Sequence, residues 1–247
     1  MVVYDEKPEK HIIIHGDIPR RFKSSRLVDR PNGKVYVTFD GDIFKQMTLP
    51  EDRYEDFVSV AKLQSPNVAF PKETVYRDER RWDTLQGYIT DRVYGNKLAN
   101  LDPRTKIRHL IAAIAEFEKE VIRLSKEEGL LFNNLSRNNL FFLPTTWSLK
   151  AVHADQYRFN TSEEHPIVAQ MNIRQLSITV LYLLVDMGKN LFKDEKLFMY
   201  FDQAVTNGKR MPSEVLTEIL NAIEKEYGEE LLTVDDFQKG LSLIQRK

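Results

Sequence analysis

The chain has 247 residues with 42% hydrophobic and 30% charged side chains, a balance that indicates a folded globular protein and excludes wholesale disorder. Because 36 Lys and Arg side chains are balanced by 37 Asp and Glu, the chain has no overall positive field, and we expect no nucleic-acid partner. The absence of cysteine excludes disulfides and thiolate chemistry, and no run approaches the roughly 20 apolar residues of a membrane span, so we expect a cytoplasmic protein without a membrane span.

Strand-like patterns dominate the first hundred residues. Short apolar or alternating segments predict strands at Ile12–Ile14, Lys34–Phe39, Ile43–Leu49, Glu73–Arg77 and Leu85–Thr90. The tripeptide Asp40-Gly41-Asp42 predicts a hairpin between the second and third of them. Pro50 predicts the start of one helix that runs to Gln64. We therefore expect an antiparallel sheet with a single helix.

The pattern changes to helical spacing after Asp102-Pro103. Apolar residues recur every three or four positions along one long helix that Gly129 ends: Ile107, Leu110, Ile111, Ile114, Phe117, Val121 and Leu124. A second helix, Ile173–Met187, is apolar on most faces and is expected to be buried centrally. Further helices are predicted at Leu197–Val205, Pro212–Tyr227 and Val234–Ile244. The predicted fold class is α+β, with a strand-rich part over residues 1–97 and a helical part over 98–247.

The segment between the two long helices, Gly129–Phe142 (GLLFNNLSRNNLFF), resembles the catalytic loop of protein kinases. In that loop His-Arg-Asp is followed, five residues after the Asp, by a metal-binding Asn, and the same frame fits here without a gap. On this frame Phe132 replaces the His, Asn134 replaces the catalytic Asp, and Asn139 keeps the metal-binding Asn. The resemblance implies a bilobal protein-kinase-like fold with a β-rich N-lobe and a helical C-lobe.

Two further segments resemble parts of the kinase small lobe. The strand around Lys45 is similar to the one that carries the nucleotide-binding Lys, with Lys34 as a competing candidate. The helix that follows is similar to helix C, which places Asp56 where the family has the Glu that pairs with the Lys, and Glu55 lies beside it. The resemblance therefore implies that Lys45, Asp56 and Asn139 contribute to a site for ATP with magnesium.

The metal-binding segment departs from the family pattern. Lys150–Tyr157 (KAVHADQY) places His153 where the magnesium-binding Asp belongs, and Asp155 two residues later; a shifted register makes Asp155 the ligand. The metal candidates are thus Asn139 and Asp155, with His153 in the alternative register. A His nitrogen is a poor ligand for magnesium, and Asn134 cannot accept a proton as a carboxylate does. The chain also lacks the glycine-rich loop. We expect ATP to bind weakly or not at all.

Simpler structural roles are open for the same residues. The Asn residues of the loop suit a polar turn, Lys45 suits a solvated strand position, and His153 suits an interior position. Three functional interpretations follow: a pseudokinase-like module that binds or regulates an unidentified protein partner, a divergent active ATP-dependent serine/threonine-type protein kinase, and a structural scaffold that binds no nucleotide. The altered acidic positions favour the first.

Overall fold

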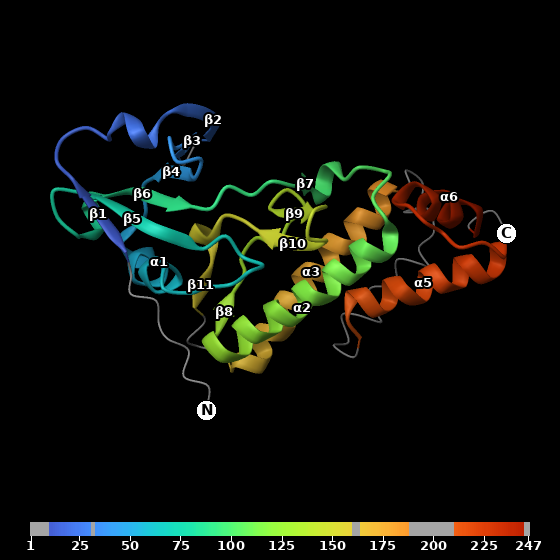
Figure 1. Ribbon diagram of the computed structural model, residues 1–247. Helices are drawn as coiled ribbons and strands as arrows, with labels where there is room; N and C mark the ends of the chain where they lie inside the picture. Colours follow the sequence, from blue (N-terminus) through green and yellow to red (C-terminus); the bar gives the residue numbers. More distant parts are fainter. Residues whose placement is uncertain (1–9, 31–32, 160–163, 188–209, 245–247) are drawn as a thin grey trace. The chain divides into compact units, whose positions relative to one another are not determined.

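The computed structural model describes residues 10–30, 33–159, 164–187 and 210–244 (Figure 1). The fold is mixed α+β, and the chain forms two compact units. The first unit comprises Met1–Val93 with Val152–Arg158, and the second comprises Tyr94–Ala151 with Phe159–Lys247. The chain therefore returns to the first unit late in the sequence, which the sequence patterns did not indicate. The division of one kinase-like domain after residue 97 stays a prediction.

A six-stranded sheet forms most of the first unit. Its strands are β1 (His11–Ile14), β2 (Ser25–Arg30), β3 (Gly33–Val37), β4 (Ile43–Met47), β5 (Pro71–Arg77) and β6 (Leu85–Thr90). Their order across the sheet is β1-β5-β6-β4-β3-β2. The predicted hairpin between β3 and β4 is confirmed. The expectation of a wholly antiparallel sheet is wrong, because β1 pairs with β5 in parallel, and β2 was not predicted.

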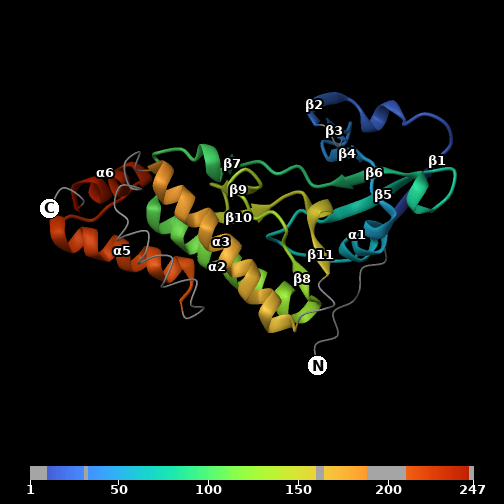
Figure 2. The same ribbon diagram turned by 180° about the vertical axis from the view of Figure 1, so that it is seen from behind.

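Helix α1 (Tyr54–Val60) packs on one face of this sheet, as both views show (Figures 1 and 2). The buried side chains on that face are Met47, Phe57, Tyr76, Leu85 and Tyr88. Because side chains alternate along a strand, their neighbours form a second cluster on the other face: Ile14, Phe22, Tyr36, Phe44, Val75 and Ile89. The helix is shorter than predicted and does not reach Gln64, because tight main-chain hydrogen bonds turn the chain at Lys62 and Leu63.

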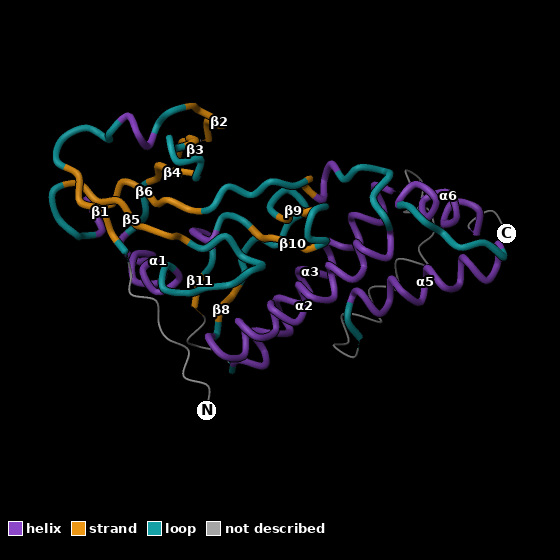
Figure 3. The backbone as a smooth tube through the Cα atoms, in the orientation of Figure 1, coloured by secondary structure: helices purple, strands orange, loops and turns teal. Residues whose placement is uncertain are grey.

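Helices make up most of the second unit (Figure 3). They are α2 (Ile107–Glu128), α3 (His165–Met187), α5 (Pro212–Tyr227) and α6 (Val234–Ile244). A small sheet has the order β10-β9-β7, from β7 (Asn96–Lys97), β9 (Leu140–Leu143) and β10 (Ser148–Ala151). The remaining short elements are the strands β8 (Leu130–Leu131) and β11 (Arg158–Phe159) and the 3-10 turns η1 (Arg20–Phe22), η2 (Glu51–Arg53), η3 (Trp82–Thr84), η4 (Leu98–Asn100) and η5 (Ala154–Gln156).

The two long helices agree with their predictions to different degrees. The apolar stripe of α2 is buried as predicted, and Gly129 ends the helix with a φ of 67°. Helix α3 begins earlier than predicted, at His165, and it is not buried on every side. Its side chains Ile167, Met171 and Ile178 are 40%, 42% and 43% exposed.

Helices α5 and α6 begin and end where the sequence predicted them. The helix expected at Leu197–Val205 lies outside the described residues. Within the described ranges, no helix is both long and apolar enough to cross a membrane.

Candidate functional site

Lys45 lies near the middle of β4, with Tyr88 of β6 as its cross-strand partner. Strand alternation directs Phe44 into the cluster on the far face of the sheet and leaves Lys45 on the face that α1 covers. The Lys45 residue is 7% exposed, so the solvated interpretation of Lys45 is wrong. The competing candidate Lys34 is exposed. Lys45 is therefore the buried cation of the first unit's central strands.

The partner of Lys45 is Asp155, which the chain's return to the first unit brings to the sheet. The Lys45 Nζ donates to Asp155 Oδ2 over 2.5 Å, and the Tyr88 hydroxyl donates to Asp155 Oδ1 over 2.6 Å. The side chains of Lys45 and Asp155 are 9% and 12% exposed. His153 Nδ1 lies 3.3 Å from Lys45 Nζ. Both carboxylate oxygens of Asp155 thus have a donor from the sheet.

Local backbone geometry brings Asp155 to this position. His153 adopts a left-handed conformation with a φ of 68°, which turns the chain into the 3-10 turn Ala154–Gln156. The Tyr157 hydroxyl donates to the carbonyl of Val152, and the Arg53 Nη2 donates to the carbonyl of Tyr157 over 2.9 Å. We call Val152–Arg158 the return segment. Contacts with β4 and β6 hold the return segment at its centre, and the bond from Arg53 of the 3-10 turn η2 holds it towards its end.

The electrostatics of the pair fix its protonation. Burial disfavours the charge on Asp155, but the adjacent Lys45 ammonium and the two hydrogen bonds outweigh it and hold the pKa of Asp155 below its usual value. Burial, together with the negative charge of Asp155, raises the pKa of Tyr88 well above its ordinary value. Tyr88 therefore keeps its proton and donates it to an ionised Asp155 at neutral pH.

Asp56 does not take the position that the kinase resemblance implied for it as the partner of Lys45. Its carboxylate lies 4.0 Å from Arg53 Nε, on the same helical turn, and its side chain is 29% exposed. Glu55 is exposed. The carboxylate that neutralises Lys45 is instead that of Asp155 in the return segment, 110 positions after Lys45 in the chain.

Asn134 and Asn139 share one loop of the second unit, as the motif predicted. Asn139 is 6% exposed, and its Nδ2 donates to the carbonyl of Asn134 over 3.2 Å, while its backbone N–H donates to Ser136. Asn139 therefore closes the loop on itself, which agrees with the simpler interpretation of a polar turn. Phe132 is fully buried, so the aromatic ring fills the core position that the frame gave it.

Sequence reasoning missed Asn172, which lies on α3 and organises the same loop. Its Oδ1 accepts the backbone N–H of Phe132 over 2.9 Å, and its Nδ2 donates to the carbonyl of Leu130 and to Ser125 Oγ, each over 2.7 Å. It also missed Tyr88 and Arg53. Asn172 lies outside the motifs quoted above, so only its apolar surroundings in the sequence could have singled it out as a buried polar residue.

The arrangement is a poor fit for a magnesium ion at Asp155. Magnesium requires oxygen ligands that are free to face it, and both oxygens of Asp155 accept hydrogen bonds from Lys45 and Tyr88. Over the part of the chain that the structure describes, no group of three or more His, Asp or Glu side chains gathers in a way that could hold a metal ion. What the cluster does provide is a closed, buried ion pair.

No protein-family model matches the chain, and no curated protein matches it. A family assignment therefore depends on the motifs and the geometry alone.

Proposed function

We propose that the chain is a kinase-like module with altered catalytic positions that acts by binding a protein partner and does not transfer phosphate. The observation that carries this proposal is the closed Lys45–Asp155 pair, in which the two groups that a kinase would offer to nucleotide and metal neutralise each other.

The order of the elements supports the kinase-like part of the proposal. Lys45 lies on the third strand of the β2-β3-β4 meander, which is followed by the 3-10 turn η2 and then by α1. A long helix, the loop with Asn134 and Asn139, a two-stranded hairpin and the acid Asp155 follow in that order. Protein kinases carry their nucleotide-binding Lys, helix C, catalytic loop and metal-binding Asp in the same sequence.

The chemistry supports the absence of phosphate transfer. A phosphate that approached Lys45 would have to displace Asp155, and a metal that approached Asp155 would have to displace Lys45 and Tyr88. Each displacement exposes a buried charge that has lost its partner, which is strongly unfavourable. Asn134, at the position of the catalytic base, has an amide that cannot take the proton of an acceptor hydroxyl.

One observation favours the second candidate, a divergent active kinase. Both His153 and Asp155 lie within hydrogen-bond distance of Lys45 Nζ, and the nearer of the two is Asp155, the residue that could supply a metal ligand in the shifted register. In that case the pair would have to open when nucleotide binds. This candidate predicts turnover, and the binding module predicts none.

Separate measurements of occupancy and chemistry test the proposal. Thermal unfolding with ATP, with and without magnesium, reports occupancy, because a ligand at 100 times its Kd stabilises the folded state by about 2.7 kcal/mol. Transfer of radiolabelled phosphate reports chemistry. We expect no transfer and no magnesium-dependent stabilisation. The double variant Asn134→Asp with His153→Asp tests whether restored carboxylates recover metal-dependent binding. The variant Lys45→Met removes the buried lysine, and Lys34→Met makes the same change at an exposed lysine as its control. Robust transfer by the unaltered protein that Asp155→Ala abolishes would establish the active kinase instead.

A further inference from the structure

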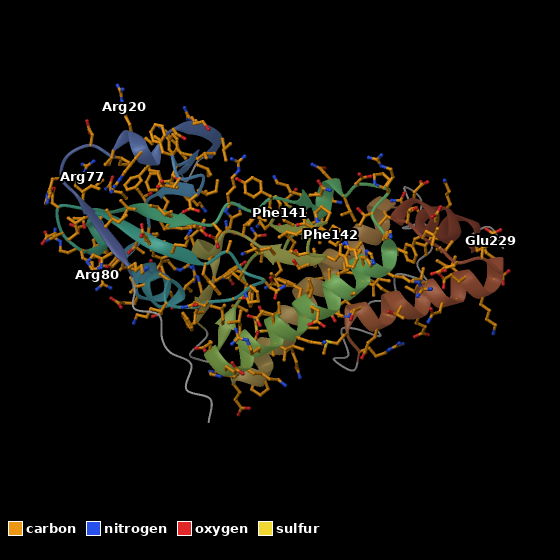
Figure 4. The ribbon with its side chains drawn as sticks, in the orientation of Figure 1. Arg20, Arg77, Arg80, Phe141, Phe142 and Glu229 are labelled. Carbon is orange, nitrogen blue, oxygen red and sulfur yellow. The ribbon has the colours of Figure 1, made fainter. Side chains whose placement is uncertain are left out.

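The segment that leads into strand β2 carries an unusual local charge. Residues 20–26 (RRFKSSR) contain four cations and no carboxylate, in a chain whose total charge is close to zero. Arg20, Arg21 and Arg26 are exposed. Figure 4 shows the side chain of Arg20 projecting outward from the first unit. We call this segment together with β2 the basic edge.

Aromatic contacts fix the basic edge to the sheet. Phe22 is 4% exposed and packs against Phe44, with the ring centroids 5.5 Å apart. The Arg21 guanidinium lies 4.7 Å from the centroid of the Phe22 ring, and the Lys23 ammonium lies 5.4 Å from that of Tyr36. The cations are thus positioned by rings and not by carboxylates, which leaves their charge available to a partner.

A comparison within the same unit shows that this lack of acidic partners is local. Arg81, in the second basic run of the chain, binds Asp83 over 2.8 Å and Glu79 over 3.0 Å. Among the described residues, no carboxylate forms an ion pair with Arg20, Arg21 or Lys23. Arg20, Arg21 and Lys23 therefore have no carboxylate partner among the described residues, whereas Arg81 of the second run has two.

Strand β2 is the last strand of the sheet and pairs only with β3 in the described part of the chain. Its outer side therefore presents backbone N–H and C=O groups to which an additional strand can bind. Leu27 is 47% exposed at a register irregularity in the β2–β3 pairing. Phe39, which is 71% exposed, donates its backbone N–H to the carbonyl of Arg21 and so lies beside the cations. Apolar contact points flank the charges.

We propose that the basic edge binds an extended acidic segment of a partner protein, which adds to the sheet beside β2. The partner's backbone would pair with β2, its carboxylates would neutralise Arg20, Arg21 and Lys23, and its apolar side chains would contact Leu27 and Phe39. The inference names the chemical class of the partner and rests on the proposed protein-binding function. Cations on an open edge also repel cationic strands, so the same residues select the acidic partner.

The strand edge favours a peptide over an anionic membrane. Lipid headgroups can neutralise cations, but they offer no regular series of donors and acceptors to an open strand. The local character of the charge also argues against long-range attraction to a charged surface, because the chain as a whole is nearly neutral.

Fluorescence anisotropy with a labelled peptide of alternating Glu and Val tests the proposal on the full chain. We expect saturable binding that weakens as salt is added. The same peptide with an N-methyl group on every residue cannot donate to the strand edge from either of its sides, and we expect it to bind at least about tenfold more weakly. A peptide of alternating Lys and Val should not bind.

Charge reversal locates the site. Arg20→Glu with Arg21→Glu should weaken binding about tenfold or more, whereas Arg77→Glu with Arg80→Glu makes the same change in charge at the other basic run, which Figure 4 also labels, and should leave it unchanged. All four residues are exposed, and thermal unfolding checks that both variants fold. Equal losses in the two variants, or equal binding of the N-methylated peptide, would overturn the proposal.

Two further outcomes separate this inference from its alternatives. The first uses vesicles of phosphatidylcholine and phosphatidylserine in a four-to-one ratio. If the protein sediments with these vesicles and does not bind the Glu-Val peptide, the basic edge binds a membrane and the peptide proposal is overturned. Phosphate transfer in the radiolabel assay would contradict the proposed function even if the peptide binds. If the protein neither transfers phosphate nor binds the peptide, only the present inference is refuted.

Discussion

Glu118 gives the sharpest prediction of stability. It lies on α2 and is 3% exposed, and its two oxygens accept the backbone N–H of Ser213 over 2.8 Å and the Ser213 hydroxyl over 2.5 Å. Ser213 is the second residue of α5, whose first-turn N–H groups have no partner inside the helix. A side chain of α2 therefore caps α5 from outside.

Burial raises the pKa of Glu118 from its ordinary 4.5 to about 7, although both bonds from Ser213 favour the charged form, and the neighbouring Glu214 adds to the rise. The folded state therefore holds a proton more tightly than the unfolded chain. The contribution to stability is fully present below pH 4.5 and is lost as the pH rises to about 7. A shift of this size corresponds to about 3 kcal/mol in the free energy of unfolding.

The variant Glu118→Gln keeps the shape of the side chain and removes its titration. Urea unfolding of the variant and the unaltered protein across this range isolates the group, because all other titrations cancel in the difference. We expect the variant to gain about 2 to 3 kcal/mol relative to the unaltered protein between pH 5 and pH 8. Glu116→Gln, at an exposed position of the same helix that pairs with Lys119, makes the same substitution at the surface and serves as the control. A flat difference for Glu118→Gln would refute the reasoning.

Three other substitutions test the contacts by urea unfolding at neutral pH. Asp155→Asn leaves the Lys45 ammonium buried without its counter-charge and should cost about 3 to 5 kcal/mol; a loss under about 1 kcal/mol would mean that the pair is open in solution. Gly87→Ala places a Cβ in a steric clash with the Lys45 carbonyl oxygen at a φ of 148° and should cost well over about 1 kcal/mol. Asn172→Ala removes three buried hydrogen bonds and should cost more than about 2 kcal/mol, whereas a neutral effect would show that water replaces the amide.

Local patterns predicted the elements whose causes are local. The β3–β4 hairpin follows from its Asp-Gly-Asp turn, and α2 follows from its apolar spacing and its terminal Gly129. Strand β1 was recognisable, but its parallel pairing with β5 joins residues about sixty positions apart, and no alternation pattern encodes that choice. Helix α1 ended early because main-chain turn bonds and a bond from Asn67 N–H to the Ser65 hydroxyl compete with further helical turns.

The sequence identified several residues of the candidate site but did not show which of them contact each other. The kinase frame singled out Lys45, Asp155 and His153, which the structure brings together. It assigned the role of partner to Asp56, because the frame orders residues along the chain and does not show which carboxylate a buried lysine meets. The kinase frame did not identify Tyr88, because a tyrosine on an alternating strand has the same sequence pattern whether its hydroxyl is free or binds a carboxylate.

A buried ion pair is weak support for stability in itself, because apolar side chains of similar volume are often as stable or more so. The role of Lys45 and Asp155 is better sought in position. The buried apolar side chains of the return segment are Ala154 and Tyr157, and an apolar contact fixes orientation less strictly than two directed hydrogen bonds to one carboxylate. Lys45 and Tyr88 therefore determine where the return segment lies on the sheet. An ion pair that positions the return segment has to stay closed, whereas a catalytic pair has to open in every turnover. The lowered pKa of Asp155 keeps its carboxylate charged at neutral pH and so favours the closed pair.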